Sequence, residues 1–152
     1  MREAKEKLLW SIALPGFGQF LNGKYVKGIG IVGLEILINV QANFNNVIIS
    51  SFQGDIEKAI GQTDYQWLMF YPCLYFLAMW DAYKDAGGGK GGYSFLPFVF
   101  TAYFVTVGCI YSSRFRLFGV LLGPVWLSML CVIPGLTFGL ILRMIIRKKY
   151  NP

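Results

Sequence analysis

The chain of 152 residues is 55% apolar and 17% aromatic, and only 14% of it is charged. Soluble globular domains carry about a quarter charged residues, so this chain has too few charges to coat a soluble surface. Lys and Arg outnumber Asp and Glu by 14 to 8, giving a net charge of +6. Because the basic residues flank apolar runs, they indicate the cytoplasmic ends of membrane helices rather than a nucleic-acid partner.

Residue types that carry chemistry are sparse. The chain has no histidine, the commonest general base and metal ligand. Cys73, Cys109 and Cys131 each lie in an apolar run without the close spacing of metal or redox motifs, so we expect small buried hydrophobic residues. The glycine-rich segment 87–92 lacks the residues that a phosphate-binding loop places around its lysine. The sequence therefore predicts no catalytic residue, no metal and no cofactor.

The first apolar run covers residues 8–21 and follows three basic residues. Pro15 and Gly16 interrupt it, and no small-x-small cleavage site follows, so we expect a retained segment rather than a signal peptide. A membrane-spanning helix needs about 20 apolar residues, which is more than this run offers. The pattern predicts a re-entrant or interfacial hairpin.

Four longer apolar runs follow, at residues 28–52, 67–83, 95–111 and 117–146. Every backbone polar group in hydrocarbon must be paired internally, so these runs should be helices. The last run contains Pro134 and Gly135 and fits either one tilted, kinked helix or two half-helices. We therefore expect an all-α integral membrane protein with a single membrane domain over 1–152, made of four spans and the N-terminal hairpin.

The basic residues favour one topology. If the first run crossed the membrane, the 14 Lys and Arg residues would divide 8 inside and 6 outside. If it dips in and returns, the division becomes 11 to 3. Cytoplasmic loops are enriched in Lys and Arg, so we expect a multi-pass protein with both termini in the cytoplasm and the acidic segment 55–64 outside.

The second run carries a polar stripe. Its members, separated by three or four residues, are Glu35, Asn39, Asn43, Asn46, Ser50 and Gln53. On one continuous helix they would share a sector of about 80°. Such a face can line a pathway or binding groove, or it can hydrogen-bond to other helices. A carboxylate at the bilayer centre costs at least about 2.5–3.5 kcal/mol, so Glu35 should be protonated or have a partner, with Lys24, Lys27, a backbone donor or another subunit as candidates.

Charged residues near the run ends have simpler interpretations. Asp81, close to the end of the third run, is expected at headgroup level and paired with Lys84 or a loop lysine. A basic cluster just past the last run has the position for contact with anionic lipid headgroups. Its members are Arg143, Arg147, Lys148 and Lys149.

Residues 14–28 carry the pattern Pro-Gly-x-Gly-Gln, then Asn-Gly, then Lys-Gly. This pattern resembles the glycine-rich hairpin of TM2-domain proteins and the segment before the first span of some sugar-transporter permeases. The resemblance covers about a tenth of the 152 residues, and the chain lacks the His-Arg-Phe-Tyr stretch of TM2 proteins and the size of a permease. It implies a protein of the bacterial cytoplasmic membrane, with no particular activity.

Two segments combine proline with glycine and are expected to break helices. Pro15, Gly16 and Gly18 lie in the first run, and Pro134 and Gly135 in the last. Paired breaks of this kind can mark a binding site in transporters.

Two functions from different classes remain open. The first is a small non-enzymatic accessory or scaffold subunit, in contact with the lipid bilayer and with another membrane protein or a second copy of itself. The alternative is a small oligomeric transporter or channel, with Glu35 and the asparagines lining a path. A membrane enzyme is the least favoured class.

Overall fold

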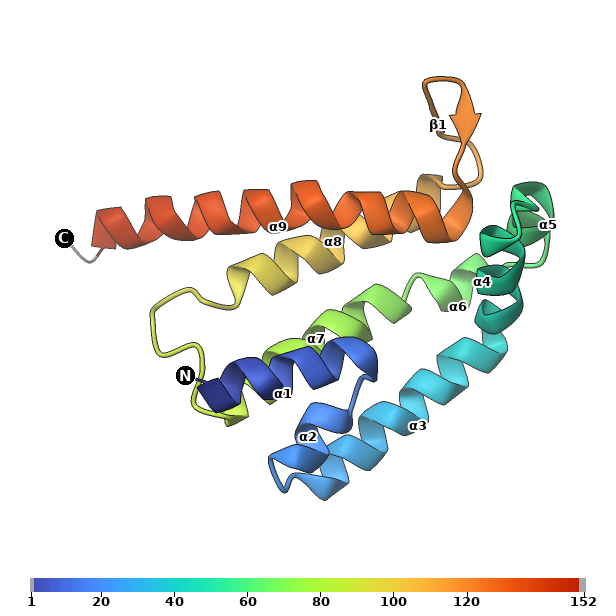
Figure 1. Ribbon diagram of the computed structural model, residues 1–152. Coiled ribbons are helices and arrows are strands. Elements are labelled where there is room, and N and C mark those ends of the chain that lie inside the picture. Colours follow the sequence, from blue (N-terminus) through green and yellow to red (C-terminus); the bar gives the residue numbers. More distant parts are fainter. Residues whose placement is uncertain (1, 151–152) are drawn as a thin grey trace.

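The computed structural model describes residues 2–150, and about three quarters of them are helical (Figure 1). The all-α fold class is confirmed. The helices are α1 (Arg2–Ala13), α2 (Phe17–Leu21), α3 (Tyr25–Gln41), α4 (Phe44–Phe52), α5 (Ile56–Gly61), α6 (Tyr65–Leu68), α7 (Tyr71–Asp85), α8 (Leu96–Tyr111) and α9 (Gly123–Tyr150). Two strands, β1 (Arg116–Leu117) and β2 (Val120–Leu121), form a short antiparallel hairpin.

The long helices form a layered bundle. The contact between α8 and α9 is the most extensive, and α7 packs against α8 and also against α1 (Figure 1). The α1–α2 hairpin and α3 lie beyond α7. Both ends of the described chain and the α7–α8 loop lie at one end of the bundle, and α4, α5 and the β-hairpin lie at the other (Figure 1).

The first apolar run is a helical hairpin. Gly16 connects α1 to α2 with φ 95°, a left-handed conformation that glycine adopts without steric cost. A Cβ at Gly16 would also lie 2.7 Å from the Val32 side chain. Pro15 and Gly16 therefore turn the chain back, so that α3 begins near the end of the bundle where α1 began (Figure 1).

The second run is two helices rather than one. α3 and α4 are bent by 65° at a break after Gln41. Asn43 has φ 54°, and asparagine is among the few residues other than glycine that tolerate this region. Its side chain donates a hydrogen bond to the Gln62 carbonyl, 3.2 Å away, which secures the bend.

The third and fourth runs differ in how closely they match the expected bounds. Pro72 has no N–H and suits the first turn of a helix, so α7 begins at Tyr71 and residues 65–68 form the separate helix α6. α8 covers nearly the whole of the run 95–111.

The last run begins later than expected, and Pro134 does not divide it. Residues 116–121 form the β-hairpin, whose turn residues Phe118 and Gly119 both have positive φ as in a type I′ turn. α9 then continues through Pro134. An internal proline costs about 3 kcal/mol, and the close contact of the following residues with α8 compensates for this loss.

Glycines make the α8–α9 contact close. A Cβ at Gly135 would lie 2.7 Å from Thr101 Cα, and one at Gly139 would lie 2.6 Å from Pro97 Cα. Both distances are too short for any side chain, and both are to backbone atoms. The two helices therefore touch backbone to backbone, as small residues allow in membrane helix pairs.

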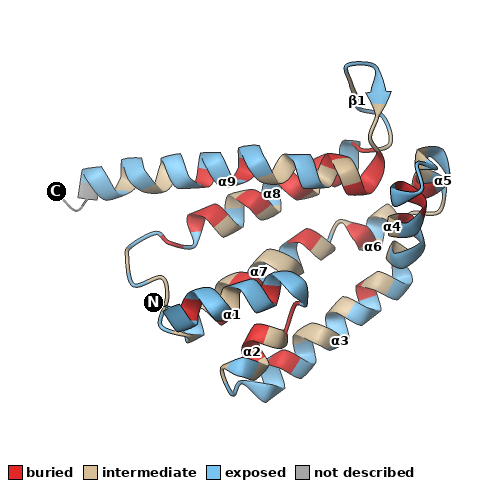
Figure 2. Ribbon diagram, in the orientation of Figure 1, coloured by how far each residue is buried: buried red, intermediate tan, exposed pale blue. Residues whose placement is uncertain are grey.

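Buried residues are few and concentrate where helices meet (Figure 2). One apolar cluster contains Ala42, Leu68 and Cys109, and a second contains Val47, Ala59 and Val125. Large apolar side chains along α3 and α9 are exposed instead. The molecule thus places much of its apolar surface outside rather than in a core.

Among the described residues, α9 over Gly123–Lys149 is long and apolar enough to cross a membrane. The bent pair α3–α4 also qualifies if it is counted as one broken span. Only 11% of the most apolar window of α9 is buried, so this helix is not enclosed by the rest of the chain.

Replacement of Gly135 or Gly139 by alanine should destabilise the protein by about 1–3 kcal/mol, the usual cost of overpacking. The measurement is thermal unfolding in a mild detergent. Gly33→Ala is the matched control, because a Cβ there would meet no atom within 4 Å. Equal stability of Gly139→Ala and Gly33→Ala would contradict the backbone contact between α8 and α9.

Candidate functional site

The glycine-rich segment 14–28 is joined to the end of α7 by polar contacts. Gln19 is fully buried, and its Nε2 donates hydrogen bonds to the Ala78 carbonyl at 2.8 Å and to Asp81 Oδ2 at 3.1 Å. Asn22 Nδ2 donates to the Ala82 carbonyl at 2.8 Å. We call these contacts, together with the ion pairs that Lys27 forms with Asp81 and Asp85, the α7 anchor.

Lys27 completes the α7 anchor from the first turn of α3. Its Nζ lies 2.7 Å from Asp81 Oδ1 and 2.9 Å from Asp85 Oδ2. Asp81 was expected to pair with Lys84 or a loop lysine. Its partner is not Lys84 but Lys27, which lies between the first and second runs of the sequence and which folding of the hairpin brings to Asp81. The sequence also contains a signal for the α7 anchor that was not recognised in the predictions. Gln19 and Asn22, three residues apart in an apolar segment, need polar partners.

Glu35 faces another helix and has a partner, as expected, but the partners are tyrosines rather than a lysine. It is partly buried on the side of α3 that faces α7, where it interacts with Tyr71 and Tyr75. Lys27, one of its expected partners, is used by Asp81 and Asp85. Among residues 2–150 no cation lies within ion-pair distance of Glu35.

The polar stripe is divided by the bend after α3. Glu35 and Asn39 lie on α3, Asn43 precedes α4, and the remaining members lie on α4 or at its end. The stripe residues bind one another and their neighbours. The hydrogen bonds are Asn39 to Asn45 (3.1 Å), Asn46 to Asn43 (2.7 Å) and Gln62 to Ser50 (2.9 Å). The stripe is therefore not one continuous helical face, and its amides stabilise the turn between two helices.

The other side of α3 is exposed and apolar. Val26, Gly30, Gly33, Leu37 and Val40 follow the alternating spacing of four and three residues that characterises helix–helix contact positions. Val26 is 87% exposed and Val40 is 70% exposed. A Cβ at Gly30 or Gly33 would meet no atom within 4 Å. We call these five residues the α3 seam, which no part of the described chain covers.

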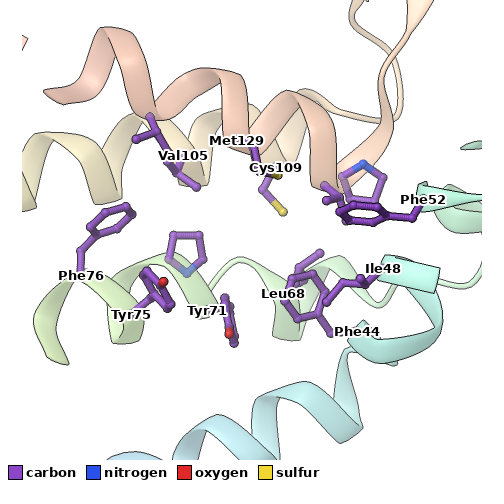
Figure 3. Close-up of a pocket in the computed structure, with 15 residues that line it drawn as sticks. Phe44, Ile48, Phe52, Leu68, Tyr71, Tyr75, Phe76, Val105, Cys109 and Met129 are labelled. Carbon is purple, nitrogen blue, oxygen red and sulfur yellow. The ribbon is translucent and has the colours of Figure 1, made fainter. Parts of the chain in front are cut away.

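A cavity of about 370 Å³ lies between α4, α7, α8 and α9. Figure 3 shows Val105, Cys109 and Met129 on one side and Tyr71 and Phe76 on the other. Its lining is almost wholly apolar, and its volume is in the range of small-molecule sites. The cavity has room for an apolar group, but it offers few polar atoms to orient one.

The remaining candidate residues are spread over the molecule. No group of three potential metal ligands occurs within residues 2–150. Cys109 is buried as expected, whereas Cys73 is exposed and Cys131 is intermediate. Arg143 and Arg147 lie on the last turns of α9, next to Gly91 of the α7–α8 loop.

Replacement of Gln19 by alanine should destabilise the protein by about 2–3 kcal/mol, because it removes buried hydrogen bonds and leaves a cavity. Lys27→Met should cost about 1 kcal/mol or less, since the lysine side chain is 48% exposed. Thermal unfolding of both variants in one detergent gives the comparison. A larger loss for Lys27→Met would show that the ion pairs, rather than the buried amide, hold the hairpin to α7.

Comparison of the chain with protein-family models, curated proteins and solved structures found no match. The resemblance of residues 14–28 to the TM2-domain hairpin therefore stays a prediction.

Proposed function

We propose that the chain is a multi-pass protein of the bacterial cytoplasmic membrane and serves, without chemistry of its own, as a small accessory or scaffold subunit. Both termini lie in the cytoplasm in this proposal. The α1–α2 hairpin enters the membrane and returns, α3–α4 and α6–α7 each cross as a broken span, and α8 and α9 each cross once. The protein acts by binding another membrane protein through the α3 seam.

The distribution of apolar and basic residues supports the membrane placement. Lipid is the solvent that an exposed apolar helix such as α9 requires. The N-terminus, the start of α3, the α7–α8 loop and the end of α9 share one end of the bundle (Figure 1). Together with the last turn of α7, these segments carry 11 of the 14 Lys and Arg residues, as positive-inside orientation requires.

The α3 seam is the observation that carries the accessory function. In membranes, helices associate where small residues let backbones approach, and two open glycines lie within the seam. The transporter alternative would use Glu35 and the asparagines instead. Those asparagines are hydrogen-bonded to each other, to Asn45 and to the Gln62 carbonyl, and Ser50 accepts from Gln62, which leaves fewer polar atoms for a path.

Bulky residues on the α3 seam should release the partner. We expect the tagged wild-type chain, extracted in nanodiscs, to retain a stoichiometric membrane protein. Gly30→Leu and Gly33→Leu should lose it, because leucine prevents close approach of a second helix. Quantitative mass analysis of the purified discs measures the retained partner.

Gly61→Leu is the matched control, since a Cβ at Gly61 also meets no atom within 4 Å but the residue lies outside the seam. Recovery of the wild-type chain alone, or as a homo-oligomer, would contradict an accessory role with a different partner. The same preparations, reconstituted into vesicles, test the alternative. An altered solute flux in Glu35→Gln would favour the transporter.

The topology predicts which residues an impermeant maleimide reaches in intact cells. In a background without the native cysteines, Arg116→Cys should be labelled at once, because the β-hairpin faces outward. Arg2→Cys and Lys90→Cys should react only after the cells are opened. Labelling of residue 2 in intact cells would contradict the proposed orientation and the returning hairpin.

A further inference from the structure

Two arginines of α9 converge on one point of the α7–α8 loop. Arg143 and Arg147 are one helical turn apart and therefore share a face of α9. A Cβ placed at Gly91 would lie 3.3 Å from Arg143 Nη2 and 3.7 Å from Arg147 Nη1. Glycine at this position keeps open the space between the loop and the two guanidinium groups.

This pair of cations lacks a counter-charge within residues 2–150. Neither guanidinium forms an ion pair or a hydrogen bond there, and Arg143 Nε is buried without a partner. Asp81 and Asp85, at the same end of the bundle, are bound to Lys27. Like charges held together repel, and a buried charged donor without an acceptor is costly. An anion between the arginines would remove both costs.

The loop adds further donors at the same place. The backbone amides of Lys90, Gly91 and Gly92 make no hydrogen bond to the described residues. Successive free amides in a glycine-rich turn form concave surfaces that bind anions. Two planar guanidinium groups with nearby amides match a tetrahedral phosphate, which accepts several charge-assisted hydrogen bonds at once.

We propose that Arg143, Arg147 and the loop around Gly91 bind the phosphate of an anionic phospholipid headgroup. Leu140 and Leu136 lie on the same face of α9, about one and two turns before Arg143, and both are exposed. They offer an apolar track for the acyl chains of that lipid, which a soluble phosphate ester would not use. The site rests on the proposed function for its place at the membrane surface.

Native mass spectrometry of the purified protein, released from detergent micelles, tests the site. With added phosphatidylglycerol we expect one retained lipid, and with phosphatidylcholine markedly less, because its headgroup has no net charge. The double variant Arg143→Gln with Arg147→Gln should bind phosphatidylglycerol at least about tenfold more weakly. Arg114→Gln with Arg116→Gln is the matched control, since it removes the same charge from the opposite end of the bundle.

A second variant distinguishes a ligand site from a structural role. Gly91→Asp places a carboxylate between the guanidinium groups, so it should raise the unfolding temperature of the protein without lipid. Added phosphatidylglycerol should then cause no further rise in unfolding temperature, in contrast to the wild type. If the Arg114/Arg116 and Arg143/Arg147 double variants weakened phosphatidylglycerol binding equally, the site would be overturned, because the binding would reflect general charge attraction. Equal retention of both lipids would also overturn it.

The source of the phosphate is tested by competition. Millimolar glycerol phosphate or inorganic phosphate should leave phosphatidylglycerol bound, because neither has acyl chains to lie along α9. Displacement by either would overturn the lipid assignment in favour of a soluble phosphate. The lipid-binding results do not depend on maleimide labelling. The proposed membrane orientation and the proposed lipid site can therefore be disproved separately.

Discussion

The buried amide of Gln19 is the constraint on which the N-terminal half of the structure depends. Its donor hydrogens reach a carbonyl and a carboxylate of α7, and a polar group in apolar surroundings must keep such partners. This requirement fixes the position of α2, and the Gly16 turn then fixes α1. The direction of α3 follows, because Lys27 binds two carboxylates on the same helix. A short sequence motif thus positions α1, α2 and α3 against α7.

Local sequence signals predicted the helical runs and their approximate bounds better than they predicted which side chains contact one another. The proline and glycine at 15–16 mark a turn wherever they occur, and the continuous run 95–111 contains no breaker that would divide α8. Periodicity alone could not show that Asn43 adopts a left-handed conformation, because asparagine is equally compatible with a helix surface. The stripe therefore looked continuous in the sequence.

Side-chain partners were predicted incorrectly where the contact depends on the folded α1–α2 hairpin. Lys27 was a candidate for Glu35, eight residues away, yet it binds Asp81 and Asp85 from another helix. Pro134 and Gly135 left open whether the last run is one helix or two half-helices, because no local rule includes the backbone contact that Gly135 and Gly139 make with α8. The α3 seam was not predicted, because a four-three spacing in an apolar run does not show which face the other helices leave exposed.

If α8 and α9 both cross the membrane as proposed, their unequal lengths have a consequence for the surrounding bilayer. The 16 residues of α8 extend about 24 Å and the 28 residues of α9 about 42 Å, while hydrocarbon is about 30 Å thick. α8 is therefore too short for a typical membrane, and α9 is too long. The helices cannot adjust separately, because their glycine contact joins them. In the proposed placement the joined pair tilts as one unit to accommodate α9, and the lipid beside the shorter α8 thins to match it. Membrane thickness would then set the angle of the whole bundle.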